Sequence, residues 1–135
     1  MTSGSATLSA TLDLPSAAPS AAAARRLVGQ LLEAWAAESF SDDASLLVSE
    51  LVSNVVRHVA SQLVMRLEVV LSGPSLRVAV VDSSAVPPAL PAPAGGTARG
   101  GHGMGLIAAV ADRWGSEEHA GGKRVWFELG PRRLG

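Results

Sequence analysis

The stretch SELVSNVVRH, Ser49 to His58, decides how this chain folds. It belongs to a longer apolar pattern of helical period, yet it carries Glu50, Asn54 and His58 at strict four-residue spacing. Residues four apart lie on one face of an α-helix, so these side chains form one polar ridge. Such a ridge serves solubility on a surface helix and ligand binding on a helix that lines a site. The rest of the chain decides between the two.

The helix that carries the ridge has two different sides. An aliphatic arc is expected to face the core, and it consists of Leu47, Val48, Leu51, Val52, Val55 and Val59. Glu50, Asn54 and His58 fall at the border between this arc and the small or hydroxyl residues opposite. A carboxylate beside an amide can hold a hydrated divalent cation, since Mg²⁺ takes only one or two protein oxygens. A solvated charged edge with a structural histidine is the alternative.

Further elements are expected on both sides of this helix. Residues 7–15 alternate like a half-buried strand, and residues 19–35 form a helix whose buried stripe is Leu27, Leu31 and Trp35. After the ridge come two strands in residues 62–82, a short helix in residues 104–115 and a last strand in residues 123–129. This order predicts an α+β two-layer sandwich, in which helices cover one face of a mixed, mostly antiparallel sheet.

Composition limits the class of protein. The 135 residues fit a single domain, residues 1–135, with an ordered core from about 7 to 130. A formal net charge of −1 argues against nucleic acid and acidic membranes as partners. The absence of cysteine excludes disulfides and thiolate chemistry. Because the sequence has no signal-peptide pattern and no apolar run near the ~18 residues of a membrane span, we expect a soluble, cytoplasmic domain.

Two more features suggest a ligand site. Asp82 lies on the same face of its predicted strand as Leu76, Val78 and Val80, so its carboxylate is expected to be buried and hydrogen-bonded. Its partner would be either a ligand amine, such as that of adenine, or a nearby arginine or capped helix. Glycines 101, 103 and 105 alternate and lead into a helix, which gathers backbone N–H groups and a helix dipole at one point. This pattern fits an anion site, although glycines spaced in this way also form flexible linkers.

Four segments, taken in order, resemble the GHKL (Bergerat-fold) ATP-binding superfamily of gyrase, MutL, heat-shock chaperones and histidine kinases. They are SELVSNVVRH (49–58), VVDSSAVPP (80–88), GGHGMGLIAAVADRWG (100–115) and GGKRVWFEL (121–129). The chain is most similar to the stand-alone branch of anti-sigma-factor serine kinases, to which actinobacterial regulatory ATP-binding proteins belong. The similarity spans Leu8 to Leu129.

The resemblance implies a role for each matching residue. Glu50 would be the general base that activates the acceptor serine, Asn54 the Mg²⁺ ligand, and Asp82 the acceptor for the adenine amine. The other residues of the implied cofactor site are His58, Arg99, Gly101, Gly103, Met104, Gly105 and Leu106. Residues from about 84 to 103 would form the ATP lid.

The resemblance also implies a function. The chain would use ATP and Mg²⁺ to phosphorylate a STAS-type anti-anti-sigma partner, would bind a sigma factor, and could form a homodimer. A nucleotide-gated binding module without catalysis is the alternative, and an interaction domain with vestigial motifs is a third hypothesis. The sequence departs from the family at Ser84, where glycine is usual, and Arg99 is the only arginine or lysine of the lid. Transfer relies on positive charge around the phosphoryl group, so a lid with one such residue favours binding over turnover.

Overall fold

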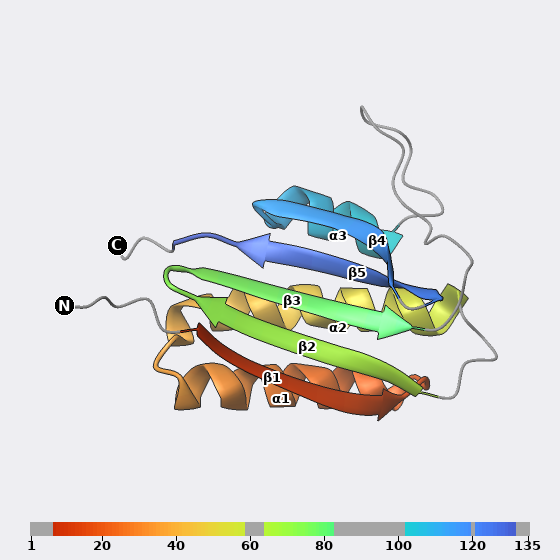
Figure 1. Cartoon of the computed structure of the whole chain (residues 1–135), viewed down its shortest axis with the longest axis horizontal. Helices are drawn as coiled ribbons and strands as arrows, with labels where there is room; N and C mark the ends of the chain where they lie inside the picture. The colour runs from red at the N-terminus through yellow and green to blue at the C-terminus, as the bar shows by residue number, and fades with distance from the viewer. Residues whose placement is uncertain (1–6, 59–63, 83–101, 120, 132–135) are drawn as a thin grey trace.

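The computed structural model describes residues 7–58, 64–82, 102–119 and 121–131. Its five strands are β1 (Thr7–Pro15), β2 (Val64–Ser72), β3 (Ser75–Asp82), β4 (Arg113–His119) and β5 (Gly122–Leu129). Its helices are α1 (Pro19–Ala34), α2 (Ser41–His58) and α3 (His102–Val110), and the 3₁₀ turn η1 (Glu38–Phe40) lies between α1 and α2. Figure 1 shows the sheet as one layer and the helices as a second layer behind it.

The strands lie in the order β1-β2-β3-β5-β4, and every neighbouring pair is antiparallel. The predicted two-layer α+β fold is therefore confirmed, with a sheet that is antiparallel throughout its described strands. A tight turn at Gly73 joins β2 to β3, and its φ of 58° lies in the left-handed region that favours glycine. The crossover from β3 to β5 makes these two strands neighbours, with Asp82 directly opposite Lys123.

Strand β4 was not predicted from the sequence. The expected helix over residues 104–115 ends at Val110, and Arg113–His119 pairs with β5 instead. The Asp112 N–H donates to the carbonyl of Glu128 at 3.0 Å, which ties the chain to β5 directly after the helix. Gly115 lies against the Trp126 ring, and a Cβ at this position would be 3.1 Å from Cζ2 of that ring. Pairing across the sheet thus outweighs the local helical pattern.

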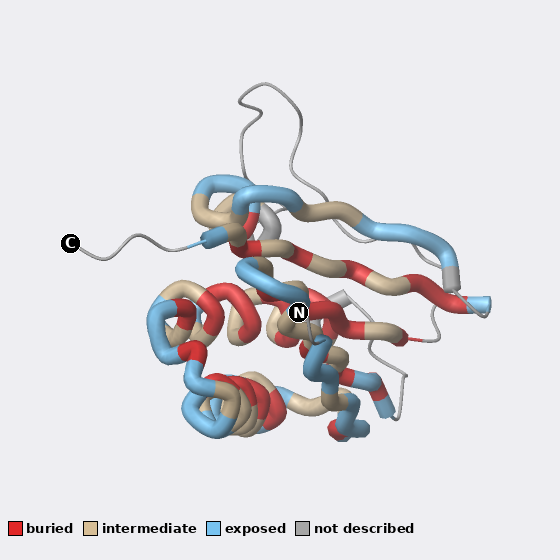
Figure 2. Tube along the Cα trace, turned by 60° about the vertical axis from the view of Figure 1, so that its left-hand side comes forward, coloured by how far each residue is buried: buried red, intermediate tan, exposed pale blue. Residues whose placement is uncertain are grey.

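The core lies between the sheet and the helices, as Figure 2 shows by the buried residues along the facing sides of both layers. The predicted arc of α2 is buried from Leu47 to Val55, and its last member, Val59, lies outside the described residues. The predicted stripe of α1 is wrong by one position. Its buried residues are Ala24, Val28 and Leu32, whereas Leu27, Leu31 and Trp35 are only partly buried. Leu27 and Leu31 line an apolar pocket together with residues of β1 and β2, including Leu12 and Leu67, and this pocket leaves them partly exposed.

None of the described helices is long and apolar enough to cross a membrane.

Candidate functional site

The ridge on α2 changes from half-buried to buried along its length. Glu50 is half-buried, whereas Asn54 is 1% exposed. His58 is the last residue of α2, and its side chain lies outside the described part of the structure. Leu51 and Val55, the neighbours of Asn54 on its core side, are buried as well. Asn54 is therefore a polar residue at the rim of the core rather than part of a solvated edge.

The Asn54 side-chain oxygen is the notable atom of the ridge. Oδ1 is buried and has no hydrogen-bond partner among the residues that the structure describes. Leaving a buried acceptor without a partner costs about 1–3 kcal/mol, so such atoms are uncommon in folded proteins. A group that arrives from outside the described chain would remove this cost. A divalent cation fits, because Mg²⁺ prefers oxygen ligands and keeps several of its waters.

Among the described residues, no group of three or more histidines, cysteines or carboxylates could hold a metal ion. This agrees with the manner in which Mg²⁺ accompanies a nucleotide, where few ligands come from the protein and the phosphates supply the others. Asn54 is the described residue whose donor atom fits this role.

Asp82 ends β3 on the inner face of the sheet, where its side chain is fully buried. Lys123 Nζ lies 3.5 Å from Asp82 Oδ1, and the lysine side chain is only 9% exposed. The buried acid predicted from strand parity therefore has a cation beside it, but the cation is a lysine from β5 rather than an arginine. Lys123 was not predicted as a site residue. The sequence does indicate its burial, because Lys123 lies on the same side of the alternating strand as the buried residues Val125, Phe127 and Leu129.

The α2 ridge and the end of β3 belong to one region. Helix α2 packs against α3, β3 and β5, and Figure 1 shows its C-terminal half behind the end of β3 and the start of β5. Glu50, Asn54 and His58 follow one another along α2 toward this end. The polar residues predicted on separate segments thus come from elements that pack together, which is the arrangement that a shared ligand would require.

The glycine-rich segment is described only in part. Residues 83–101, including Ser84, Arg99, Gly101 and all but the last residues of the predicted lid, lie outside the described residues. His102, Gly103 and Met104 open α3, although their side chains are not described. Gly105 has open space where a Cβ would stand, so packing within the described chain does not require glycine there. Leu106 packs against the hydrophobic core.

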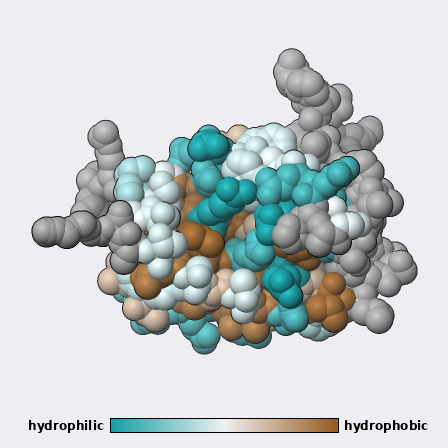
Figure 3. Space-filling model, viewed as in Figure 1, coloured by the Kyte–Doolittle hydropathy of each residue, from teal (hydrophilic) through white to brown (hydrophobic). Residues whose placement is uncertain are grey.

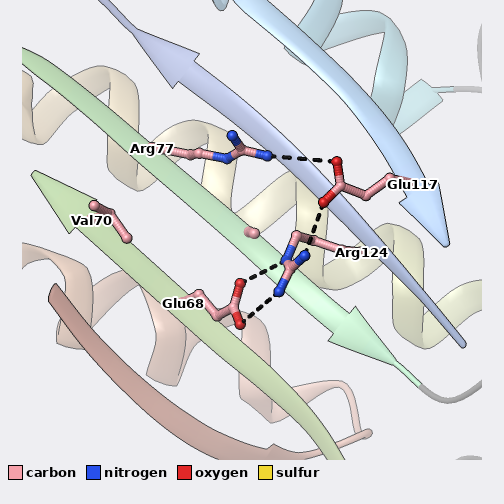
Figure 4. Close-up of a pocket in the computed structure, with 6 residues that line it drawn as sticks. Glu68, Val70, Arg77, Glu117 and Arg124 are labelled. Carbon is pink, nitrogen blue, oxygen red and sulfur yellow. Dashed lines mark hydrogen bonds and ion pairs between the residues drawn. The ribbon is translucent and has the colours of Figure 1, made fainter. Parts of the chain in front are cut away.

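A second polar cluster covers the opposite face of the sheet. Figure 3 shows this face with a band of hydrophilic side chains across it. A pocket of about 230 Å³ on this face (Figure 4) is lined by Glu68, Val70, Arg77, Ala79, Glu117 and Arg124. Arg124 reaches across β3, and its Nε–H donates to Glu68 Oε1 at 2.9 Å. This hydrogen bond raises the pKa of Arg124.

The charges of this cluster compensate one another. Arg124 Nη1 also donates to Glu117 Oε2 at 2.9 Å, and Arg77 lies 3.9 Å from the other oxygen of Glu117. The Arg77 guanidinium stands 4.3 Å from the centre of the Trp126 ring. These contacts join β2, β3, β5 and β4, so we assign the cluster to sheet stability.

Comparison with known proteins agrees with this architecture. Residues 14–129 match the family described as histidine kinase-like ATPase domain. An uncharacterized Streptomyces coelicolor protein, SCO4941, is 38% identical over 84 residues, which cover 60% of this chain and 79% of that protein.

A similar solved structure contains the RsbU and RsbW domains of Rv1364c from Mycobacterium tuberculosis. Its TM-score is 0.70 at 18% identity, and the match covers 94% of this chain but only 33% of that one. The present chain thus spans about a third of the length of that chain, and the likeness shows a common fold.

Proposed function

The chain belongs to the histidine kinase-like ATPase domain family, and from this membership we propose that it binds Mg·ATP and acts as a serine/threonine kinase of the anti-sigma-factor type. The site would be formed by α2, the end of β3 and the segment that leads into α3. The observation that carries the proposal is the buried Asn54 Oδ1, which has no hydrogen-bond partner among the described residues. This acceptor lies on the same border of the helix as Glu50, in the C-terminal half of α2, which lies behind the end of β3 (Figure 1).

Asn54 would hold the cation that accompanies the nucleotide. Its amide oxygen is neutral, so it can bind Mg²⁺ without adding charge beside the phosphates. When bound, Mg²⁺ neutralises part of the triphosphate charge and fixes its orientation. The rim of the core around Asn54 limits access of water to this contact, which strengthens it.

Glu50 would be the general base. It precedes Asn54 by one helical turn, about 6 Å along the axis at 1.5 Å per residue, and it lies on the same border of α2. Its half-buried carboxylate remains accessible to an incoming hydroxyl group. Glu50 would accept the proton of that hydroxyl while the oxygen attacks the γ-phosphorus, and the bond to ADP breaks on the opposite side.

Asp82 would recognise the base. An ionised carboxylate only accepts hydrogen bonds, so it pairs with the amine at position 6 of adenine and disfavours a carbonyl there. Glycines 101, 103 and 105 would allow the backbone to approach the phosphates, with His58, Arg99, Met104 and Leu106 completing the site. For Gly105 the open space at its Cβ position supports a role other than packing.

The proposed partner is a STAS-type anti-anti-sigma protein, with a sigma factor as a second partner. Support comes from the likeness of the four sequence motifs to anti-sigma-factor kinases and from the fold shared with a chain that contains an RsbW domain. A non-catalytic, nucleotide-gated binding module is the second candidate. It is favoured by the sequence of the lid, where Arg99 is the only arginine or lysine in residues 84–103.

Incubation with γ-labelled ATP, Mg²⁺ and candidate STAS-domain proteins from the same genome tests the two candidates. A kinase labels a serine or threonine of the partner, and the label is lost when Glu50 is replaced by glutamine. Partner binding that responds to nucleotide without any label would support the binding module. Absence of both nucleotide binding and label would refute the proposal.

A further inference from the structure

The inner faces of β3 and β5 are apolar except at one end. Leu76, Val78 and Val80 on β3, and Val125, Phe127 and Leu129 on β5, are all 0% exposed. The next inward-facing residue at this end is Asp82 on β3 and Lys123 on β5. These two residues lie directly opposite each other. Both side chains remain buried, at 0% and 9% exposure. A buried ion pair thus occupies the place where the pattern would continue with two more apolar residues.

Stability alone does not explain this pair. Removing two charges from water is costly, and well-packed apolar residues in place of a buried ion pair are often neutral or stabilising. Lysine in particular is seldom buried. The outer face of the sheet shows the cheaper arrangement, because the partly exposed Arg124 of β5 contacts Glu68 of β2 through two nitrogens, at 2.9 and 3.3 Å. The inner pair therefore calls for a reason beyond holding β3 to β5.

The geometry of the contact suggests the reason. Lys123 approaches one carboxylate oxygen, Oδ1, at 3.5 Å. An ammonium on one side of a carboxylate balances its charge and fixes its rotation about the Cβ–Cγ bond. The second oxygen then keeps a constant direction. A ligand amine that donates to this oxygen then binds an acceptor whose orientation is already fixed. The cost of removing the carboxylate from water is already offset by the lysine.

We propose that Lys123 is a positioning residue for base recognition, which orients Asp82 toward the exocyclic amine of a 6-aminopurine nucleotide. This inference rests on the proposed function, since it assigns the specificity of the same site. The preference for adenine then depends on two residues: Asp82 contacts the base, and Lys123 acts through Asp82. A lysine with a structural role only would support every nucleotide equally.

Binding of two Mg-nucleotides by calorimetry tests the inference. ATP carries the amine, whereas purine riboside triphosphate lacks it and is otherwise the same. We expect the parent protein to prefer ATP by about ten-fold or more, the scale of one hydrogen bond to a charged group. In Lys123→Met, ATP affinity should fall by about ten-fold, while affinity for purine riboside triphosphate changes by less than about two-fold.

Two control variants complete the experiment. Arg124→Met removes the ion pair of the next residue on the opposite face, and both nucleotide affinities should stay at the parental values. In an Asp82→Asn background, Lys123→Met should lower ATP affinity by less than about two-fold, because the lysine acts through the carboxylate. If Lys123→Met does not fold, Lys123→Ala replaces it, since it also removes the ammonium and leaves room for water beside Asp82.

The outcomes separate the two proposals. An equal loss of both nucleotides in the folded Lys123 variant, or unchanged ATP affinity, would overturn the role of Lys123 and leave the nucleotide site in place. A parent protein that binds neither nucleotide would overturn the proposed function and this inference together.

Discussion

Replacement of Asn54 by leucine should stabilise the nucleotide-free protein and at the same time remove its Mg²⁺-dependent binding of ATP. Asn54 is 1% exposed, and its Oδ1 has no hydrogen-bond partner among the described residues. The folded protein therefore carries the desolvation cost of that acceptor, about 1–3 kcal/mol. Leucine has a similar size and shape, and its neighbours Leu51 and Val55 are apolar. We expect a net gain of about 1–2 kcal/mol in the free energy of unfolding.

Urea denaturation followed by circular dichroism measures this gain. With a slope of roughly 2 kcal/mol per M for a small domain, the midpoint should rise by about 0.5–1 M. Ser53→Ala is the matched control, because Ser53 is the preceding residue of α2 and only half-buried, and it should leave the midpoint and ATP binding nearly unchanged. A lower midpoint for Asn54→Leu would mean that the amide makes stabilising contacts within the protein. Parental Mg·ATP affinity in this variant would refute the assignment of Asn54 as the metal ligand.

Three other substitutions separate catalysis, binding and stability. Glu50→Gln should leave ATP affinity nearly unchanged and lower phosphoryl transfer by ~10²–10⁴-fold, as measured with labelled ATP; parental transfer would exclude Glu50 as the base. Gly105→Ala should raise the free energy of unfolding by about 0.5–1 kcal/mol, since Gly105 lies inside α3 with open space where a Cβ would stand. The same substitution should weaken ATP binding, and unchanged ATP affinity would show that no phosphate approaches this backbone. Arg124→Met should lower the urea midpoint by the same amount at about pH 6.5 and 8.5. The hydrogen bond to Glu68 raises the pKa of Arg124 above its ordinary value. The contribution of Arg124 is therefore fully present below that ordinary value and is lost only as the pH rises through the raised pKa. A contribution that vanished at about pH 8.5 would contradict this.

Most of the fold was predictable because its local patterns are strong. Three patterns predict their elements without tertiary information: the alternation in residues 7–15, the helical period around Leu47 and Leu51, and the strand pattern in residues 62–82. Strand β4 was missed because Ile107, Val110 and Trp114 continue a helical spacing, and only pairing with β5 shows that Trp114 belongs to a strand. The buried face of α1 was off by one position because Leu27 and Leu31 line an apolar pocket with residues of β1 and β2, which leaves them partly exposed.

The candidate site was predictable in its residue types but not in its burial. The four-residue spacing placed Asn54 on a border, and a border residue is buried or exposed according to what packs beside it. Packing of α2 against α3, β3 and β5 settles this for Asn54. Strand parity predicted the burial of Asp82 correctly, and the same parity argument applied to β5 leads to Lys123. Such a lysine is easily taken for the solvated start of a strand, since lysine is rarely buried.

The most direct test of the account is calorimetric titration of the parent protein with ATP, once with Mg²⁺ and once with a chelator. Asn54 would reach the ligand through the metal and Asp82 through the base, so we expect Mg·ATP to bind and its affinity to fall strongly without the metal. Asn54→Leu should bind ATP no better with Mg²⁺ than without it. Absence of binding heat at millimolar Mg·ATP in the folded parent protein, or an affinity independent of Mg²⁺, would contradict the account.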